Sequence, residues 1–594
     1  MYRTKALKAL RCKMEQMGVS AIIIPTNDPH FGEYTQDRYK VREWLSGFNG
    51  SAGTLVVTME QAALWTDSRY FVQAASQLQG SGIKLMRMKM EGTPSIPGWL
   101  KELYPQGEQV AIDKSLFSYS EYEALRADMS PCNVVLIDDI FDELWAERPE
   151  LKFNPVLYLD KKYSGESPRS KHNRIVEALG IKDNRFAYII TMCDEVAWLC
   201  NIRGTDIEYN PLVQSYAVIT NNATHLFVNL NSADEQVRDI LAAEGVELHP
   251  YNNFTKILGE LPADTLRICS KGKITVRDYQ ALDIPGARFM EDPTTGGTVN
   301  MFKAVKNNWE RDGFEKAFVA DGMAWCKVLK FIDDNIKSNN VLTEYAIGEK
   351  FAQFRREDEN YRGESFEPIV AFGAAAALPH YSASEENTQV IGKDNFLLMD
   401  TGAQYVFGTT DTTRTIPIGT LTEQQRKHYT LVLKGMIRLS MAKFPKNTRG
   451  SQLDILARGP LFNDAAMYFH GTGHGIGHYL CVHEGPQSIR MEENPVTLVP
   501  GMVLSNEPAV YLDGEYGIRT ENVLLVEMWK HSRMNEFYGF RTYTLVPIDT
   551  TCVIWNLLDE DETTWIKEYN NSVCKKIAPL LDAETAQWLI EKYQ

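Results

Sequence analysis

Five side chains in the C-terminal half of the chain are of the types that bind divalent metal ions. They are Asp400 and Asp411 in the segment LLMDTGAQYVFGTTDTTRT, His474 in HGTGHGIGH, Glu507 in LSNEPAVY and Glu521 in GIRTENVLLV. Carboxylate oxygens suit hard ions such as Mn²⁺, and one imidazole shifts the preference from calcium towards transition metals. Four carboxylates balance the charge of two divalent ions, which lie ~3.5–4 Å apart in hydrolytic centres. The set therefore predicts a dinuclear metallohydrolase site.

The residues around these acids predict two pairs of strands. Phe396–Asp400 and Thr409–Ile418 are rich in β-branched and apolar residues, and the glycines between them predict a turn. Val503–Tyr511 and Gly517–Val526 read as the second pair, and we expect their glutamates to face inward. Asp is disfavoured in strands, and a buried carboxylate must be paired or must bind a metal. Strand pairing would bring these acids to one cluster.

A glycine-rich run contributes four of the chain's 11 histidines, namely His470, His474, His478 and His483. The spacing of the first three would place them on one face of a helix, as in the HExxH motif of zinc peptidases. Position 471 is glycine rather than glutamate, however, and the alternating glycines argue against a helix. The glycines also imitate a dinucleotide-binding loop, but the preceding strand and the distal acid are missing. We therefore expect a glycine-rich loop that presents imidazoles to the metal centre.

Taken together, the motifs DTGAQY…GTTDTTRT, HGTGHGIG…VHEGP, NEP and GIRTEN resemble those of the pita-bread metallopeptidases, and specifically the long, three-domain Xaa-Pro aminopeptidase (aminopeptidase P) family. The N-terminal segments SGFNGSAGTLVVT and ALWTDSRYF resemble the first domain of that form, so the likeness covers essentially the whole chain. The resemblance implies a metal-dependent aminopeptidase that hydrolyses the N-terminal Xaa-Pro bond of peptides. It implies two Mn²⁺ ions with hydroxide held between them as the nucleophile, and a homodimer.

The resemblance also implies roles for individual residues. The metal ligands are Asp400, Asp411, His474, Glu507 and Glu521, with Glu507 also the candidate general base. The substrate pocket is lined by His380, His470 and His483, and His380 and His483 are also catalytic candidates. Arg519 is a candidate substrate contact, and the alternative is that it forms a structural ion pair.

Two positions depart from the pattern of the family. They are His478, where relatives carry other residues, and NEPAVY, where a DEPGYY-like run is common. Neither departure removes a ligand, so both bear on fine specificity. The remaining histidines are expected to be ordinary core or surface residues. They are His30, His172, His225, His249, His428 and His531.

A weak internal repeat predicts two domains of one fold in tandem. AIIIPTND followed by WLSGF, near the N-terminus, has an echo in AYIITMCD followed by WLCNI. With the resemblance, this gives a fold of mixed α/β and α+β class. We expect two creatinase-like α/β domains, at residues 1–158 and 159–304, and a pita-bread catalytic domain with a C-terminal helical tail at residues 305–594.

Composition narrows the cellular setting. The net charge is 62 − 78 = −16, and an acidic chain lacks the basic patches that nucleic-acid binding needs. No apolar run approaches the ~18 residues of a membrane span, and the charged, amphipathic N-terminus is not typical of a signal peptide. The nine scattered cysteines, without a CxxC motif, indicate reduced thiols. We therefore expect a cytoplasmic protein with no nucleic-acid or membrane partner.

Three alternatives stay open on the sequence alone. A prolidase would cleave only Xaa-Pro dipeptides, and the two additional N-terminal domains argue against it. A non-catalytic peptide-binding scaffold, or creatinase-like C–N hydrolysis without metal, is disfavoured because all five ligands are present. In the leading interpretation the scissile bond is a tertiary amide without an N–H, so the site must hold proline by shape.

Overall fold

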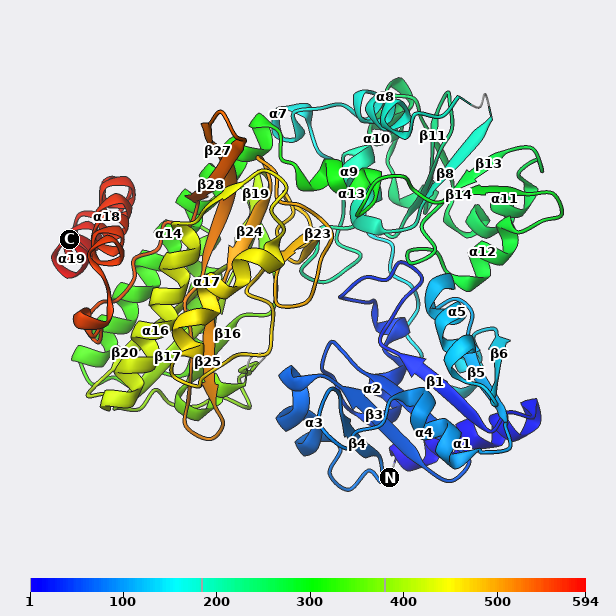
Figure 1. Ribbon diagram of the computed structural model, residues 1–594, viewed down its shortest axis with the longest axis horizontal. Helices are drawn as coiled ribbons and strands as arrows, with labels where there is room; N and C mark the ends of the chain where they lie inside the picture. Colours follow the sequence, from blue (N-terminus) through cyan, green and yellow to red (C-terminus); the bar gives the residue numbers. More distant parts are fainter. Residues whose placement is uncertain (1, 183–184, 379–380) are drawn as a thin grey trace. The chain divides into compact units, whose positions relative to one another are not determined.

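The computed structural model describes residues 2–182, 185–378 and 381–594 (Figure 1). The chain forms two compact units. The N-terminal unit comprises Met1–Leu159, Glu166–Glu208 and Leu212–Pro293, and the C-terminal unit comprises Asp160–Gly165, Tyr209–Pro211 and Thr294–Gln594. The predicted domain limits at residues 158 and 304 stay predictions.

The first part of the N-terminal unit is built on a six-stranded mixed sheet. Its strands are β1 (Ala21–Pro25), β2 (Thr54–Thr58), β3 (Ala62–Thr66), β4 (Lys84–Arg87), β5 (Gln109–Asp113) and β6 (Asn133–Ile137), in the order β4-β3-β2-β1-β5-β6. Helices include α1 (Tyr2–Met17), α2 (Val41–Ser46), α3 (Phe71–Gln77), α4 (Ile96–Leu103) and α5 (Tyr119–Asp128). Leu10 and Met14 of α1 are buried against apolar residues of β1 and β2, which gives this part its own core.

The second part of the N-terminal unit repeats this topology strand by strand. Its strands are β8 (Phe186–Ile190), β10 (Tyr216–Ile219), β11 (Thr224–Val228), β12 (Val246–Pro250), β13 (Leu266–Ile268) and β14 (Arg288–Met290), in the order β12-β11-β10-β8-β13-β14. Parallel and antiparallel pairings match between the two sheets at each position. The helices include α8 (Pro168–Leu179), α9 (Cys193–Cys200), α10 (Glu235–Ala243), α11 (Phe254–Glu260) and α12 (Val276–Leu282). The predicted tandem repeat is confirmed.

The C-terminal unit holds the strands that carry the predicted metal ligands. One sheet has the order β16 (Ile369–Phe372), β17 (Asn395–Thr401), β20 (Thr412–Ile418). A six-stranded sheet has the order β21 (Lys443–Pro445), β28 (Glu536–Thr542), β27 (Asn522–His531), β24 (Val503–Asn506), β22 (Gly473–Gly475), β23 (Glu484–Ile489). Smaller ladders are β15 (Tyr361–Glu364) with β18 (Ala403–Tyr405) and β19 (Gly408–Thr409), and β25 (Ala509–Leu512) with β26 (Tyr516–Arg519).

Helices of the C-terminal unit precede, separate and follow these strands. They are α13 (Thr298–Ala304), α14 (Asn308–Lys337), α15 (Glu344–Arg355), α16 (Glu423–Ser440), α17 (Gly450–Phe462), α18 (Glu560–Ile577) and α19 (Ala583–Tyr593). The side chains of Thr343 and Thr422 accept hydrogen bonds from the first turns of α15 and α16, as N-caps do. The helix α16 ends at Ser440, because Phe444 pairs with Tyr538 in the sheet and Pro445 cannot continue a helix.

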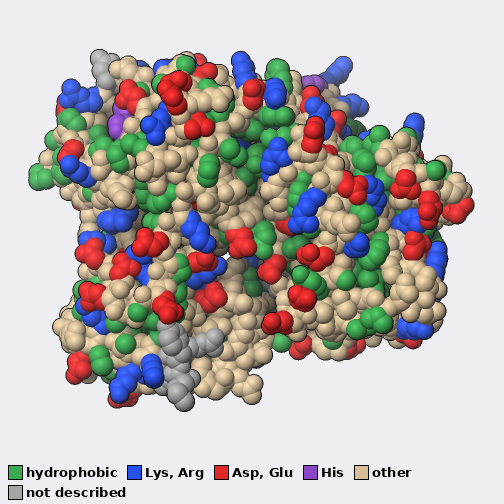
Figure 2. Space-filling view, turned by 180° about the vertical axis from the view of Figure 1, so that it is seen from behind, with side chains coloured by type: hydrophobic (Ala, Val, Ile, Leu, Met, Phe, Trp, Pro, Cys, Tyr) green, Lys and Arg blue, Asp and Glu red, His purple; other side chains and the backbone are tan. Residues whose placement is uncertain are grey.

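The surface is polar and the cores are apolar. On the face shown in Figure 2, acidic and basic side chains are interspersed. All nine cysteines are free, and all except Cys12 and Cys481 are buried. Within the described residues, every helix is too short or too polar to cross a lipid bilayer.

Candidate metal centre

Antiparallel pairing brings the two predicted aspartates together. Asp400 lies in β17 opposite Thr413 of β20, and Asp411 immediately precedes β20. The chain between the strands has to pass close to itself. A Cβ atom at Gly402 would lie 2.0 Å from the carbonyl oxygen of Thr410, so only glycine fits there.

The two glutamates come from one neighbouring pair of strands. In the β24–β27 ladder Asn506 pairs with Asn522, so Glu507 and Glu521 are the next residues at the same end of that ladder. The backbone N–H of Glu521 also donates to the carbonyl of Thr413, and this hydrogen bond connects the glutamate to the strand that follows Asp411. The predicted inward projection of both glutamates agrees with this placement, since Glu521 is buried and Glu507 is half-buried.

His474 lies on a short strand and not in a loop as expected. It is the middle residue of β22, which pairs with β23 and β24. The glycines on either side are required by close packing. A Cβ atom at Gly473 would lie 2.0 Å from the carbonyl oxygen of Ser505, and one at Gly475 would lie 2.4 Å from that of Glu484. The glycines that argued against a helix therefore permit a strand between two close neighbours.

All five predicted ligands lie in one cluster. The Nε2 atom of His474 is 3.4 Å from a carboxylate oxygen of Asp411 and 3.4 Å from one of Glu507. Asp411, His474 and Glu521 each offer a ligand atom within 4.8 Å of the other two. Asp400 and Asp411 are close enough for their charges to interact, and both act on Glu507 and Glu521.

The charge in this cluster is unbalanced. Burial, then the negative charges of Asp411, Glu507 and Asp400, hold the pKa of Glu521 well above its ordinary value. Burial raises the pKa of Glu507 to about 7, although His474 and Arg519 oppose the shift. The pKa of Asp400 is also raised, chiefly by burial. For His474 burial lowers the pKa, but Asp411 and Glu507 overcome this effect and bring it to about 9.

The donor set fits divalent metal ions. Four carboxylates surround one guanidinium, that of Arg519, which forms an ion pair with one oxygen of Asp400. The other oxygen of Asp400, Oδ1, is buried and accepts no hydrogen bond from any described residue. A buried carboxylate oxygen needs a donor or a cation. Oxygen ligands with one imidazole match ions such as Mn²⁺, for which these residues would be the ligands.

Comparison with known proteins decides the family. Residues 312–528 match the model of metallopeptidase family M24, residues 536–594 match the C-terminal region of peptidase M24, and residues 7–144 and 147–310 each match a creatinase/prolidase N-terminal domain. A probable Xaa-Pro aminopeptidase P of Coprinopsis cinerea is 37% identical over 99% of this chain and 97% of its own. The chain belongs to the Xaa-Pro aminopeptidase P family.

Two further relatives support this assignment. Xaa-Pro aminopeptidase 1 of Dictyostelium discoideum is 34% identical over 98% of this chain and 94% of its own. The crystal structure of X-prolyl aminopeptidase from Caenorhabditis elegans, described as a cytosolic enzyme with a di-nuclear active site, superposes with a TM-score of 0.94 at 32% identity, covering both chains completely. The chain is thus a metallopeptidase, and the expected succession of two creatinase-like domains and a catalytic domain is confirmed.

Two of the three pocket histidines predicted for an Xaa-Pro aminopeptidase P border the cluster. The Nδ1 atom of His470 is 3.9 Å from a carboxylate oxygen of Glu507, and its Nε2 atom is 3.0 Å from the hydroxyl of Tyr511. His483 is exposed and lies edge-on to the ring of His474, with 4.5 Å between ring centroids. The third, His380, lies outside the described residues.

Arg519, the predicted substrate contact, is buried within the metallopeptidase centre. Its guanidinium donates to Asp400, to the hydroxyl of Tyr511 and to the hydroxyl of Thr413. These contacts match its alternative as a structural ion pair, and the substrate contact stays a prediction. His478 is buried against Gly313 and Phe314 of α14, where it fills space in the core.

Supporting residues of the aminopeptidase site escaped prediction from sequence. Thr413 donates to Glu521 at 2.8 Å, Ser505 donates to Glu507 at 3.2 Å, and Tyr511 joins His470 to Arg519. Thr413 lies two residues from Asp411, and Ser505 and Tyr511 lie two and four residues from Glu507. All three are on strands whose alternating pattern is visible in the sequence. Hydroxyl groups at such positions were the available signal, but only the pairing register shows which of them turn inward.

Proposed function

We propose that this chain removes the N-terminal residue that precedes proline in peptides, with two divalent metal ions held by the five clustered side chains. The observation that carries the proposal is the buried excess of carboxylates, four against one guanidinium, with an orphaned oxygen on Asp400. Membership of the Xaa-Pro aminopeptidase P family, and the di-nuclear active site described for the Caenorhabditis elegans relative, support it.

Each ligand has a place in this proposal. Asp411 and Glu521 would hold both ions, Asp400 would hold one of them, and His474 with Glu507 would hold the other. Manganese is the expected metal, since oxygen donors dominate the set. When bound, two such ions supply a Lewis acid for the scissile carbonyl and lower the pKa of water towards neutrality.

Glu507 is our candidate for moving the proton. Hydrolysis of an Xaa-Pro bond adds the oxygen of water to the carbonyl carbon and breaks the bond to the proline nitrogen, which must then gain a proton. Glu507 lies within the cluster, 3.4 Å from Nε2 of His474, so its carboxylate can accept the proton of water and return it to that nitrogen. Ser505 donates to Oε1 of Glu507 and fixes the orientation of the carboxylate.

The pocket histidines hold the substrate in this proposal. His483, exposed beside His474, is positioned to donate to the substrate carbonyl or to the departing nitrogen. His470, held by Tyr511, and His380 line the proline pocket. Arg519 holds Asp400 in place, because its guanidinium donates to both Asp400 and Tyr511.

The substrate length separates an aminopeptidase from a prolidase. Metal-stripped protein is assayed on Arg-Pro-Pro and Arg-Pro, with and without Mn²⁺. The proposal predicts manganese-dependent release of arginine from the tripeptide. Cleavage of the dipeptide alone would make the enzyme a prolidase. Failure to hydrolyse either peptide would favour a binding scaffold.

We also propose a cytoplasmic, homodimeric enzyme. Seven buried, free cysteines suit a reducing compartment, and the Caenorhabditis elegans relative is described as cytosolic. Light scattering of the purified protein would give twice the mass of the 67.5 kDa chain if it is a dimer.

A further inference from the structure

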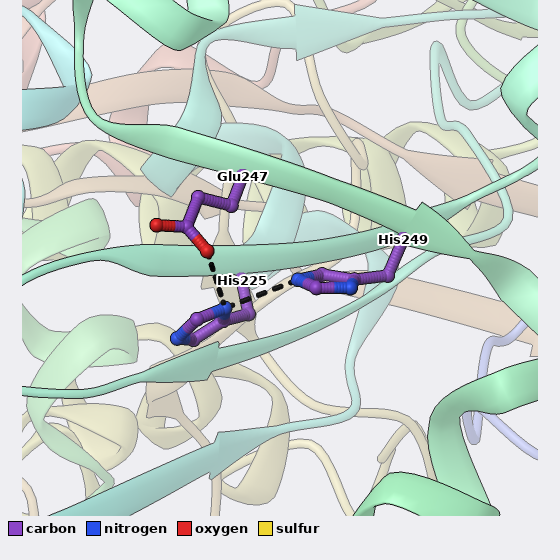
Figure 3. Close-up of side chains that lie close together, drawn as sticks. All are labelled: His225, Glu247 and His249. Atoms are coloured by element: carbon purple, nitrogen blue, oxygen red, sulfur yellow. Dashed lines mark hydrogen bonds and ion pairs between the residues drawn. The ribbon is translucent and has the colours of Figure 1, made fainter.

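A second group of metal-binding side chains lies on the edge of the second sheet of the N-terminal unit. β12 is the edge strand, and it pairs in parallel with β11. His225 of β11 is in register with Glu247 of β12, and Phe227 with His249. Residues two apart on a strand face the same side, as do partners in register. The backbone therefore directs His225, Glu247 and His249 to one face, where Figure 3 shows them converging.

The distances between their donor atoms match those around a tetrahedral zinc ion. The Nδ1 atom of His225 is 3.1 Å from Nε2 of His249 and 3.3 Å from a carboxylate oxygen of Glu247. All three donor atoms lie within 4.8 Å of one another. Ligands ~2.0–2.1 Å from Zn²⁺ at the corners of a tetrahedron are roughly 3.3 Å apart.

The surroundings of His225 orient its ring for metal binding. The hydroxyl of Thr220 donates to the carbonyl of Ala223 at 3.2 Å, so its oxygen is left to accept from Nε2–H of His225, 3.5 Å away. A proton on Nε2 leaves the lone pair on Nδ1, the atom that faces Glu247 and His249. Such a hydrogen bond on the far nitrogen is how proteins fix the tautomer of a metal-binding histidine.

The contact between His225 and Glu247 suits a cation. With the proton of His225 on Nε2, the lone pair of its Nδ1 faces both Glu247 and His249. One proton on Nε2 of His249 can satisfy the lone pair of His225. The carboxylate oxygen of Glu247, 3.3 Å from the same lone pair, receives no proton from it. An ion between the three donors would turn both contacts into favourable ones.

We propose that His225, Glu247 and His249 bind a Zn²⁺ ion that links the edge strand β12 to β11. Two imidazoles and one carboxylate are a ligand set that zinc accepts, and they favour it over Mn²⁺. A fourth position is left to water, because the side chain of Glu247 is 61% exposed and that of His225 26% exposed.

The first sheet of the same unit provides an internal comparison. Its corresponding pair of strands, β3 and β4, reads AALWT and KLMR, without a histidine, an acid or a cysteine. The two sheets share their topology, so the fold does not require the cluster. The three donors occur in the second sheet and not at the corresponding strands of the first. A site for a ligand accounts for this difference, and a requirement of the fold does not.

Zinc bound here would stabilise the second part of the N-terminal unit without taking part in hydrolysis. A ligand that binds only the folded state raises the free energy of unfolding in proportion to the logarithm of its concentration above Kd. The metal content of the whole enzyme would then exceed the two ions of the catalytic centre by one.

The test counts zinc in full-length variants. Stripped protein is loaded with Zn²⁺, dialysed and analysed by mass spectrometry for metal per chain. H249A and the near-isosteric E247Q should each retain one equivalent less than the unchanged protein. H531A is the matched control, because His531 lies at the exposed end of β27, 3.8 Å from Glu536 in a His–Glu pair, and no third donor joins this pair among the described residues. It should retain the full amount.

Three results together decide the proposal. Circular dichroism establishes that each variant is folded, and Arg-Pro-Pro hydrolysis should be unchanged in H249A. Equal zinc content in H249A, E247Q and the unchanged protein would overturn the proposal. Since counting metal does not require turnover, loss of the proposed aminopeptidase activity and loss of this zinc site would be recognised separately. If H249A is unfolded, E247Q alone carries the test, as its side chain is exposed.

Discussion

Two groups of buried acids in the C-terminal unit differ in the cations that accompany them. Glu484 is completely buried, and its two carboxylate oxygens form ion pairs with Lys306 at 2.7 Å and Lys303 at 2.8 Å. Among the described residues, the four acids Asp400, Asp411, Glu507 and Glu521 are accompanied by the guanidinium of Arg519 and the imidazole of His474, two cations for four carboxylates. Both sets of acids lie in or beside strands and glycine-rich segments, so the types of the acidic residues do not distinguish them. They differ in the number of buried cations for each carboxylate.

The difference shows what each group is for. A buried carboxylate with two lysines has both of its oxygens paired within the protein, and its contribution is to packing and orientation. A group of four carboxylates with one guanidinium and one imidazole is unfavourable in the folded chain, as the raised pKa values of Glu507 and Glu521 indicate. We infer that the four acids can be buried together because divalent ions bind among them and supply the missing positive charge.

The largest effect is expected from a change inside the unbalanced group. E521Q should lower hydrolysis of Arg-Pro-Pro by more than the roughly 10–100-fold that follows loss of a ligand's hydrogen-bonding partner. The same change removes one buried negative charge, so the metal-free variant should unfold at a higher denaturant concentration than the metal-free parent. An unchanged rate, or a less stable metal-free variant, would contradict the comparison.

A change at Glu484 should have the opposite effects: a loss of stability with metal binding retained. E484Q leaves Lys303 and Lys306 buried with no carboxylate, and breaking a buried ion pair in this way costs about 3–5 kcal/mol. Denaturant unfolding, monitored by circular dichroism, measures that loss. Mn²⁺ binding to the folded variant should persist, since the five ligands are untouched. Loss of metal without loss of stability would place Glu484 in the catalytic centre.

The smallest expected effect is on the pH dependence of stability. The folded-state pKa of Glu507, about 7, exceeds its unfolded value of about 4.5, and that of His474, about 9, exceeds about 6.5. A group whose pKa rises on folding stabilises the protein below its unfolded pKa and loses this contribution as the pH passes its folded pKa. Metal-free protein should therefore become less stable between pH 4.5 and 9.

Metal-free E507Q provides the comparison for this dependence. It should show a shallower decline between pH 4.5 and 7, where Glu507 titrates, and the decline due to His474 should end at a lower pH, because Glu507 no longer raises the pKa of that imidazole. Chemical denaturation at a series of pH values measures both slopes. A metal-free parent whose stability rises with pH across this window would show that the acids are not held in a shared negative field.

Sequence alone predicted much of this molecule, because much of it rests on local patterns. Alternation and β-branched residues placed Asp400 and Asp411 at adjacent strands, and repeated segments indicated two domains of one topology. The strand at His474 was missed because glycine has a low strand propensity, and only the close approach of Ser505 and Glu484 explains it.

The remaining features depend on register between distant segments. His225 and His249 were expected to be ordinary residues, since each is isolated in the sequence. They meet only because β11 and β12 pair in parallel with His225 opposite Glu247. The contacts of Arg519 with Asp400 and of Tyr511 with His470 likewise join segments whose relative positions no spacing rule supplies.

The two-metal centre is tested most directly by a crystal structure of the Mn²⁺-loaded enzyme with anomalous diffraction recorded at the manganese absorption edge. We expect two anomalous peaks, on the order of 3.5–4 Å apart, each bonded to carboxylate oxygens of the cluster and one of them to Nε2 of His474. A single peak, or manganese bound away from Asp411 and Glu521, would contradict this expectation.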